Sequence, residues 1–196
     1  MEKGYQRLLL RFPFLADEDK KQLWGISKLQ RVKPGEILIR EGELSYYHIT
    51  VVKGLLRNYI ITSEGEERTV LLVAEQMSTG CSDTIFRNEP AGEIIEAIEP
   101  TLGVLVDTRE LDKLAHSNTA LLRLQKLMIQ KMLNESVLHI RFHTVLTPEE
   151  RFLELQKQRS DLILRTPQKH LASYLGIHPV SLSRIKARLM NNKKNN

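Results

Sequence analysis

The sequence predicts an α+β fold with an N-terminal antiparallel β-roll, a long helix and a C-terminal all-α domain. Three observations support this prediction. Short β-rich segments alternate with glycine-bearing turns between residues 30 and 107. Residues 120–142 then carry a helical apolar repeat without glycine or proline. Two short amphipathic segments flank Gly176 near the end of the chain.

Residues 1–30 are expected to be helical and to pack on the β-roll. Tyr5, Leu8 and Leu9 fall on one helical face, and Asp17 is placed to cap a second helix. From Gln30 the apolar period changes to two. The expected strands lie around Val32 and at 37–39, 47–51, 55–61, 69–73, 93–98 and 101–107, with one helical turn at 82–87. Strands of this length with frequent glycine turns are typical of an antiparallel barrel or roll.

Two apolar rows run along the expected long helix. One contains Leu121, Leu124, Met128, Met132, Leu138 and Phe142, and the other contains Leu122, Ile129, Leu133 and Ile140. We expect one row to face the β-roll and the other to face a second copy of the chain, because a helix that is apolar over a broad surface needs two partners. The long helix is thus predicted to be a dimerisation helix.

A domain boundary is predicted at residues 143–147. Thr147, Pro148 and Glu150 form the pattern of a capping box, which starts a new helix. The predicted domains are therefore residues 1–143, the β-roll with its long helix, and residues 144–196. Residues 156–164 are expected to connect the new helix to the last two segments.

Residues 166–189 have the pattern of a helix-turn-helix. Thr166 can cap the first helix, with Pro167 at its first position, and Gly176 can end it in the left-handed conformation. His178 and Pro179 restart the chain. The second helix then carries an apolar stripe of Leu182, Ile185 and Leu189. In this motif the second helix enters the DNA major groove.

The polar side of the second helix suggests how DNA would be contacted. Arg184 is the best candidate for reading a base, because a guanidinium bonds both O6 and N7 of guanine. Ser181 could bond a phosphate, and Val180 could touch a thymine methyl group. Lys186 and Arg188 complete the polar side. The alternative is an ordinary helical hairpin within a core.

The charge of the chain is concentrated at its C-terminal end. The whole sequence contains 29 basic and 24 acidic residues. Residues 162–196 contain no acidic residue and seven basic ones: Arg165, Lys169, Arg184, Lys186, Arg188, Lys193 and Lys194. Residues 1–161 therefore carry 22 basic and 24 acidic residues. A polyanionic partner at the C-terminal end explains this asymmetry.

The composition excludes several classes of site. The single cysteine, Cys81, rules out an internal disulfide and an iron–sulfur cluster held by four cysteines of one chain. His139 and His143 would share a helix face, but no third ligand accompanies them, so we expect no metal and no cofactor. No catalytic constellation is recognisable. Without a signal peptide or a membrane-length apolar segment, we expect a cytoplasmic, bacterial protein.

The sequence resembles the Crp/Fnr family of bacterial transcription regulators along nearly its whole length. The resemblance is carried by PGEILIREGE at 34–43, the segment 47–54, the turn at Gly65 and LASYLGIHPVSLSRIKARL at 171–189. It implies a cyclic-nucleotide-binding-like fold, a homodimer and binding to a roughly palindromic DNA operator, with RNA polymerase as a further candidate partner. Arg184 matches the family's base-reading arginine, and four residues match its phosphate-contacting positions: Gln168, Lys169, His178 and Ser181.

The sequence departs from the members that bind cyclic AMP. Those members carry a Gly-Glu pair followed by Arg-Ser or Arg-Thr, whereas here Gly80 is followed by Cys81 and the second pair aligns with Ala91-Gly92-Glu93. Glu93 would repel a phosphate, and Arg87 falls several residues too early. We therefore expect no useful binding of cyclic AMP or cyclic GMP. The effector is unknown or absent, and its expected pocket is Gly80, Cys81, Ser82 and Glu93, with Cys81 as a buried inert thiol.

Together these observations predict a dimeric, sequence-specific DNA-binding regulator that is not an enzyme. Two alternatives stay open. One is a small-molecule-sensing module that acts through a protein partner, with the basic helix as its docking surface. The other is an enzyme that uses the pocket of the β-roll. Against the enzyme, His48 is the only histidine of the expected roll, too few for a histidine metal site.

Overall fold

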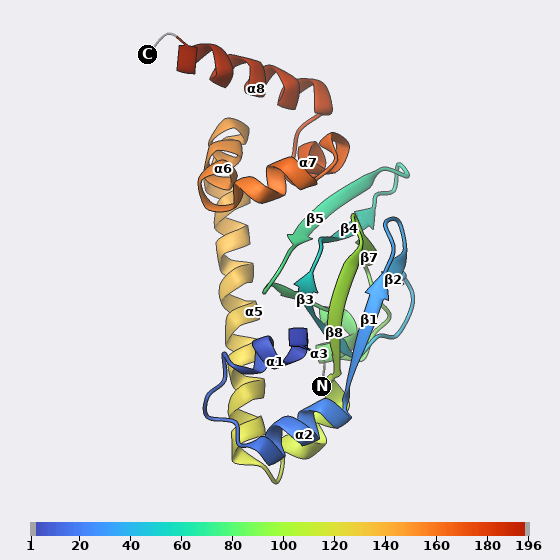
Figure 1. Cartoon of the computed structure of the whole chain (residues 1–196). Coiled ribbons are helices and arrows are strands. Elements are labelled where there is room, and N and C mark those ends of the chain that lie inside the picture. The colour runs from blue at the N-terminus through green and yellow to red at the C-terminus, as the bar shows by residue number, and fades with distance from the viewer. Residues whose placement is uncertain (1–2, 195–196) are drawn as a thin grey trace.

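Two antiparallel sheets form a β-roll in the computed structural model, which describes residues 3–194 (Figure 1). One four-stranded sheet has the order β1-β8-β3-β6 and the other has the order β2-β7-β4-β5. The strands are β1 (Ser27–Val32), β2 (Ile37–Ile39), β3 (Tyr47–Lys53), β4 (Leu56–Ile61), β5 (Glu67–Val73), β6 (Ser78–Thr79), β7 (Ile94–Ala97) and β8 (Thr101–Asp107), and the helical turn α3 spans Ser82–Arg87. The predicted α+β fold is confirmed.

Side chains along β3 point alternately into the roll and away from it. Ile49 and Val51 are fully buried among the apolar side chains that fill the roll, including Leu56 and Ile95. His48 and Thr50 pair with Val106 and Val104 of β8, whose side chains belong to a different core on the other side of the sheet. Because successive side chains of a strand point to opposite faces, His48 and Thr50 face outward from the roll.

The outer face of this sheet is covered by helices, which form a second core with Val104 and Val106. These helices are α1 (Lys3–Leu9), α2 (Asp17–Gly25), α4 (Thr108–Ala115) and α5 (Thr119–Val145). Asp17 is not the cap of α2, as predicted, but its first residue. Ala16 occupies the cap position, and its N–H donates to a carboxylate oxygen of Asp19 at 2.8 Å. The expectation of helix through residue 30 was also wrong, because Leu29 pairs with Val104 in the sheet.

The long helix α5 runs along the whole β-roll and carries both predicted apolar rows (Figure 1). Leu121 and Leu124 are buried against the roll and the N-terminal helices. Leu138 of the same row is 53% exposed, so this row leaves the roll in the second half of α5. The other row remains on the surface, with exposed fractions of 52% for Leu122, 45% for Ile129, 65% for Leu133 and 59% for Ile140.

The C-terminal part begins with α6 (Pro148–Arg165), whose predicted capping box is present. The Thr147 hydroxyl accepts from the N–H of Glu150, and the Glu150 carboxylate accepts from the N–H of Thr147. Residues 156–164 are not a separate connector, because α6 continues through them with a kink at Arg159 (φ −146°, ψ 60°). The Arg159 guanidinium is held there by Asp161 at 2.9–3.0 Å and by Sδ of Met77 at 3.1 Å.

The two parts of the chain share one hydrophobic core. Leu55, Leu72 and Ala74 of the β-roll pack with apolar side chains of the C-terminal helices, including Phe152 and Leu171. The end of α5 at Val145 and the start of α6 at Pro148 flank the predicted boundary at residues 143–147. The boundary itself stays a prediction. The contacts across it mean that the C-terminal helices have a defined position on the roll.

Candidate nucleic-acid interface

Helices α7 (Gln168–Tyr174) and α8 (Pro179–Lys194) are joined by a tight turn at Gly176. Gly176 has φ +70°, and the N–H of Ile177 donates to the carbonyl of Ala172 at 3.0 Å. This is the glycine-terminated helix end that the sequence predicted. Arg151 of α6 completes the end, because its Nη1 donates to the carbonyl of Leu175 at 2.6 Å.

The predicted start of α7 was wrong by one position. Pro167 is the cap residue, and its carbonyl accepts from the N–H groups of His170 and Leu171. Thr166 ends α6 instead, and its buried hydroxyl has no hydrogen-bond partner in the described chain. The restart at His178 agrees with the sequence, since Nδ1 of His178 accepts from the N–H of Val180 at 3.3 Å. His178 therefore also caps α8.

Replacing Gly176 with alanine is expected to lower the free energy of unfolding by about 1–2 kcal/mol, because an L side chain is disfavoured at positive φ. The added Cβ would also lie 2.8 Å from Nη1 of Arg151. Gly25→Ala is the matched control. A Cβ at Gly25 meets nothing within 4 Å, so that variant should keep or slightly gain stability. Urea denaturation checks both, and equal effects would contradict the assigned role of Gly176.

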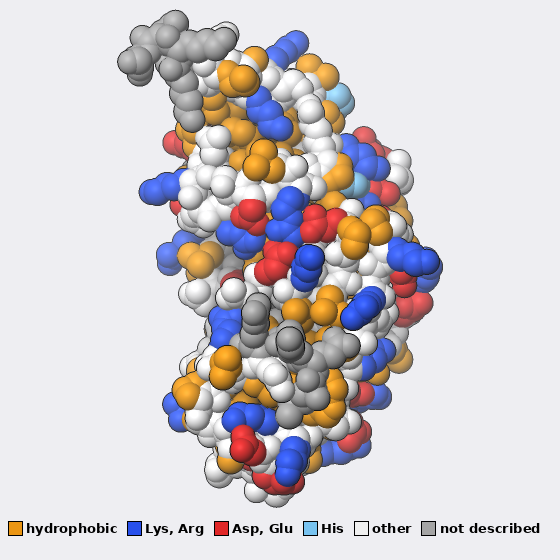
Figure 2. All heavy atoms as spheres, in the orientation of Figure 1, with side chains coloured by type: hydrophobic (Ala, Val, Ile, Leu, Met, Phe, Trp, Pro, Cys, Tyr) orange, Lys and Arg blue, Asp and Glu red, His pale blue; other side chains and the backbone are white. Residues whose placement is uncertain are grey.

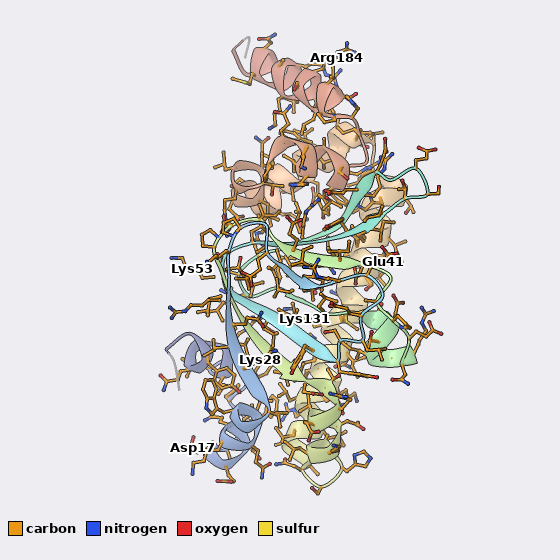
Figure 3. The ribbon with its side chains drawn as sticks, turned by 90° about the vertical axis from the view of Figure 1, so that its right-hand side faces the viewer. Asp17, Lys28, Glu41, Lys53, Lys131 and Arg184 are labelled. Atoms are coloured by element: carbon orange, nitrogen blue, oxygen red, sulfur yellow. The ribbon has the colours of Figure 1, made fainter. Side chains whose placement is uncertain are left out.

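The apolar side of α8 anchors it to the rest of the C-terminal part. Leu182 is fully buried and Ile185 is 8% exposed, both in the core shared with the β-roll. The opposite side of α8 is turned away from the roll, and Arg184 points outward from it (Figure 3). Arg184 is exposed and makes no hydrogen bond or ion pair with any residue of the described chain. Its guanidinium is therefore available to an external acceptor.

The other predicted contact residues differ in how available they are. Val180 is 51% exposed, while Ser181 and Lys186 are half-buried on α8. Lys169 lies exposed at the start of α7 and lowers the pKa of nearby Glu67 only as a minor contributor. The side chains of Lys193 and Lys194 lie outside the part of the structure that is described.

Two of the predicted contacts are engaged within the protein. Gln168 donates to Oγ of Ser183 at 2.5 Å, which ties the start of α7 to α8. Arg188 forms an ion pair with Glu149 at the start of α6. Both side chains would have to exchange these partners for phosphate oxygens. In this structure they stabilise the arrangement of the C-terminal helices.

Arg165 belongs to the junction with the β-roll and not to the outer basic surface. Its guanidinium pairs with Glu75 at 2.9 Å and with Glu99 at 2.5 Å, both from the roll. Figure 2 shows basic and acidic side chains meeting at this level of the molecule, between the roll and the C-terminal helices. The hydrogen bonds to Glu99 and Glu75 raise the pKa of Arg165. The sequence-based charge count therefore overstated the free positive charge.

Helix α7 lies against β5 of the roll (Figure 1), and a second polar contact attaches it there. Arg57 of β4 is 2% exposed and donates to Glu96 through Nε at 2.8 Å and to Glu67 at 2.7 Å. Its Nη1 lies 2.8 Å from Nδ1 of His170 on α7. Nearby, Oγ of Ser173 accepts from the N–H of Thr69 at 2.8 Å. Sequence reasoning missed this contact because its members are up to 113 residues apart.

None of the predicted effector residues lines either of the two cavities beside α5, which have volumes of about 390 and 310 Å³. Cys81 is fully buried in the roll core, as predicted, and caps α3 through its backbone. A Cβ at Gly80 would lie 2.8 Å from the carbonyl of Tyr47, so Gly80 allows a close approach of the backbone. Ser82 is exposed on α3. Two of the four make side-chain polar contacts: the Glu93 carboxylate accepts from Nδ2 of Asn58 at 2.9 Å, and Sγ of Cys81 accepts from the Thr84 hydroxyl at 3.6 Å.

The interior of the roll lacks a cation near Glu93 in the described chain. Asn58 also bonds to Thr79, whose hydroxyl is buried. Burial raises the pKa of Glu93, and the charge of Asp83 adds to this effect. Arg87 is exposed and pairs with Asp83 and Glu89 on the outside of α3. The polar group at this point of the roll is thus a carboxyl without a basic neighbour.

Comparison with solved structures identifies the architecture. FixK2 from Bradyrhizobium japonicum is 21% identical, with a TM-score of 0.72 over 86% of each chain. The chain has the Crp/Fnr fold. The CLP regulator of Xanthomonas campestris is 13% identical, with a TM-score of 0.69 over 89% of this chain and 91% of its own. A putative regulator of the Crp/Fnr family from Eubacterium rectale is 19% identical, with a TM-score of 0.67 over 94% and 87%.

No family model and no curated protein matches the sequence. Within the described part of this Crp/Fnr-fold chain, no helix is long and apolar enough to cross a membrane. The same residues contain no group of three or more side chains placed to hold a metal ion. The rings of His139 and His143 do lie close, with centroids 4.4 Å apart and planes tilted by 59°, and the Tyr174 ring lies beside both.

Proposed function

We propose that this chain is a sequence-specific transcription regulator that binds double-stranded DNA as a homodimer. One α8 would lie in each of two successive major grooves of a roughly palindromic operator. The observation that carries the proposal is the exposed, unpaired Arg184 on the outer side of a helix whose inner side is anchored by Leu182 and Ile185. An unpaired guanidinium on a firmly anchored helix suits bidentate recognition of guanine.

The neighbours of Arg184 support the same proposal. The first turn of α8 presents Ser181, whose hydroxyl can donate to a phosphate, while the N–H groups of this turn already donate to His178. Lys169 of α7 would contact the DNA backbone beside it. Val180, 51% exposed, offers an apolar contact for a thymine methyl group. Arg188 and Gln168 would contribute after releasing Glu149 and Ser183.

A second copy of the chain is the proposed partner of the exposed apolar row on α5. The four side chains of this row are each between 45% and 65% exposed and follow one face of the helix over about five turns. Such a row suits the seam of a parallel helix pair, in which both copies of α8 lie beyond the same end of the seam. Pairing through α5 would place two copies of α8 on the same side of the dimer, as binding to two half-sites requires.

The regulator is further proposed not to respond to cyclic AMP or cyclic GMP. A cyclic phosphate in the roll would face the Glu93 carboxyl and no cation of the described chain, since Arg87 is bound to Asp83 and Glu89. Desolvating the phosphate without an ionic partner is costly. Isothermal titration calorimetry with cyclic AMP should therefore show no binding at micromolar concentrations, and saturable micromolar binding would contradict this.

The test of the proposed function is selection of bound sequences from a random double-stranded DNA pool at moderate salt. Wild type should enrich an inverted repeat. Arg184→Ala should weaken binding to it by about 1–3 kcal/mol and relax the preference at one base pair of each half-site. Lys169→Ala is the matched comparison. It should weaken all sequences alike and reduce the slope of log affinity against log salt by about 1.

The outcomes separate the readings of the basic helix. Binding without enrichment would leave only electrostatic attraction to DNA, and an Arg184→Ala variant with unchanged preference would reject Arg184 as the reading residue. Absence of DNA binding, both without ligand and in the presence of an apolar carboxylic acid such as decanoate, would instead favour a sensing module that acts through a protein partner.

A further inference from the structure

A cavity of about 310 Å³ lies between the β-roll, the N-terminal segment and α5. Its walls are mostly apolar and include Tyr5, Phe12, Val104, Val106, Leu124 and Met128. A neighbouring cavity of about 390 Å³ shares His48, Met128 and Met132 with it. The volume is at the lower end of the range for ligand sites, about 300–1,000 Å³, and therefore suits a small molecule.

Two cations meet at one edge of this cavity. Nζ of Lys131 on α5 donates to the carbonyl of Gln76 at 2.9 Å, and Nη1 of Arg11 donates to the same oxygen at 3.4 Å. Figure 3 shows Lys131 where α5 passes the middle of the roll. Gln76 itself has φ +67°, a conformation that residues other than glycine rarely adopt. A neutral carbonyl is a weak partner for two cations.

The charge of the lining is unbalanced in favour of an anion. Among the lining residues that the structure describes, Glu135 is the only acidic one, with a carboxylate oxygen 3.6 Å from Nζ of Lys131. The two cations and one carboxylate leave a net charge of +1 beside an apolar space. A ligand carboxylate could replace or join the Gln76 carbonyl and form charge-assisted hydrogen bonds with Lys131 and Arg11.

The cavity also contains polar groups without partners of their own. The Tyr5 hydroxyl is buried and has no hydrogen bond in the described chain. Burial raises the pKa of Tyr5, and the Ser27 side chain opposes this effect. His48 makes no hydrogen bond with the described residues either, while the adjacent Thr50 and Ser78 hydroxyls bond to each other at 3.1 Å. Unsatisfied buried polar groups are unusual and often mark a binding site.

We propose that this cavity binds a small carboxylic acid with an apolar body. The carboxylate would lie between Lys131 and Arg11, and the body among Tyr5, Phe12 and Leu124. This site is separate from the residues Gly80, Cys81, Ser82 and Glu93 that the sequence suggested. Binding of the acid is independent of the proposed function, and only its effect on DNA binding rests on that function.

The position of Gln76 suggests how the ligand would be communicated. The next residue, Met77, packs against both the roll core and the core of the C-terminal helices, and its sulfur accepts from Arg159 at the kink of α6. If a carboxylate accepts the hydrogen bonds of Lys131 and Arg11 in place of the Gln76 carbonyl, the backbone at Gln76 and Met77 loses two of its contacts. The C-terminal helices would then favour a different position on the roll.

The test is titration of the full chain with decanoate, followed by tryptophan fluorescence. Trp24 is the only tryptophan, and its ring lies 4.7 Å from that of Tyr5 in the cavity wall. Decanoate should give a saturable change, and decylamine, which has a comparable tail and the opposite charge, should bind at least about tenfold more weakly. Each methylene removed from the acid should weaken binding about fourfold.

Substitutions of Lys131 test where the carboxylate of the ligand binds. Lys131→Gln should weaken decanoate about tenfold or more and leave 1-decanol unchanged, because only the charged contact is lost. Lys126→Gln removes an exposed lysine of the same helix outside the cavity and should change neither ligand. Lys131→Arg keeps the cation and should restore the preference for the acid over the amine, which separates loss of charge from loss of folding.

Three results would overturn the proposal: no saturable signal with decanoate, equal binding of acid and amine, or equal effects of Lys131→Gln and Lys126→Gln. None of them bears on DNA recognition, which the Arg184 comparison tests without ligand. If the acid binds and DNA affinity does not respond to it, the site stands and the communication through Met77 is rejected.

Discussion

Replacing Arg57 with methionine is expected to lower the free energy of unfolding by about 3 kcal/mol. The Arg57 side chain is 3% exposed and ion-paired to Glu96 and Glu67. Without it, two neighbouring carboxylates lose their shared cation, and the Glu96 side chain is only 20% exposed. The value is at the low end for a buried pair because Glu67, at 43% exposed, is partly screened by water. Urea denaturation measures the change.

The matched control is Arg68→Met on β5. Arg68 is 52% exposed and pairs with Glu66, so its loss should change stability by less than about 1 kcal/mol. If the two variants behave alike, the Arg57 contacts contribute no more than a surface pair does, and the packing of α7 on the roll must depend on the apolar core alone.

The Arg57→Met variant should also change how the free energy of unfolding depends on pH. Burial lowers the pKa of His170 to about 4, and the charges of Arg57 and Lys169 contribute. The unfolded chain takes up this proton near pH 6.5 and the folded chain does not, so stability falls as the pH drops from about 6.5 toward 4. Removing Arg57 raises the pKa of His170, so the His170 contribution to this loss should become smaller. Denaturation series at pH 7 and pH 5 compare the two proteins.

Replacing Leu133 with aspartate is expected to produce a monomer and to weaken binding to a two-half-site operator by about 10²–10⁴-fold. Leu133 is the most exposed member of the apolar row on α5, at 65%, so its substitution costs the isolated chain little. In a helix pair, however, an uncompensated charge would be buried at the seam. Analytical ultracentrifugation gives the oligomeric state, and DNA binding at fixed salt gives the affinity.

Leu164→Asp provides the control for this experiment. Leu164 is 86% exposed on α6 and lies outside the apolar row, so the variant should remain a dimer. A Leu133→Asp protein that stays dimeric would reject the α5 interface. A monomer that retains full affinity for the inverted repeat would show instead that one copy of α8 is sufficient.

Periodicity predicted the elements whose pattern is local. The roll, the long helix, the capping box at Thr147 and the turn at Gly176 all follow from residues close in sequence, and the structure confirms them. The predictions failed where contacts with residues distant in the sequence determine the secondary structure. Leu29 is a strand residue because it pairs with Val104, and α6 is kinked at Arg159, where Asp161 and Met77 hold the guanidinium.

The candidate site shows the same division. Arg184 was identified from helical spacing, and the structure leaves it exposed. Sequence could not show that Arg165 and Arg188 pair with Glu75, Glu99 and Glu149, which lie 39 to 90 positions away. The local pair of Arg165 with Asp161, at 3.3 Å, follows from the i,i+4 spacing. Sequence reasoning likewise gave no sign of the cavity beside Lys131, which is assembled from the N-terminal segment, the strands β3, β6 and β8, and the middle of α5.

The core shared by the β-roll and the C-terminal helices limits how this chain can be recombined. A hybrid made by exchanging everything after Leu146 for the equivalent part of another regulator would place a foreign surface against Leu55 and Leu72. It would also leave Glu75 and Glu99 without Arg165, and Arg57 without His170. Transplanting the proposed operator preference alone therefore calls for grafting the outward side chains of α8 onto the native helix. The unit that can be exchanged independently is thus smaller than the part of the chain after Leu146.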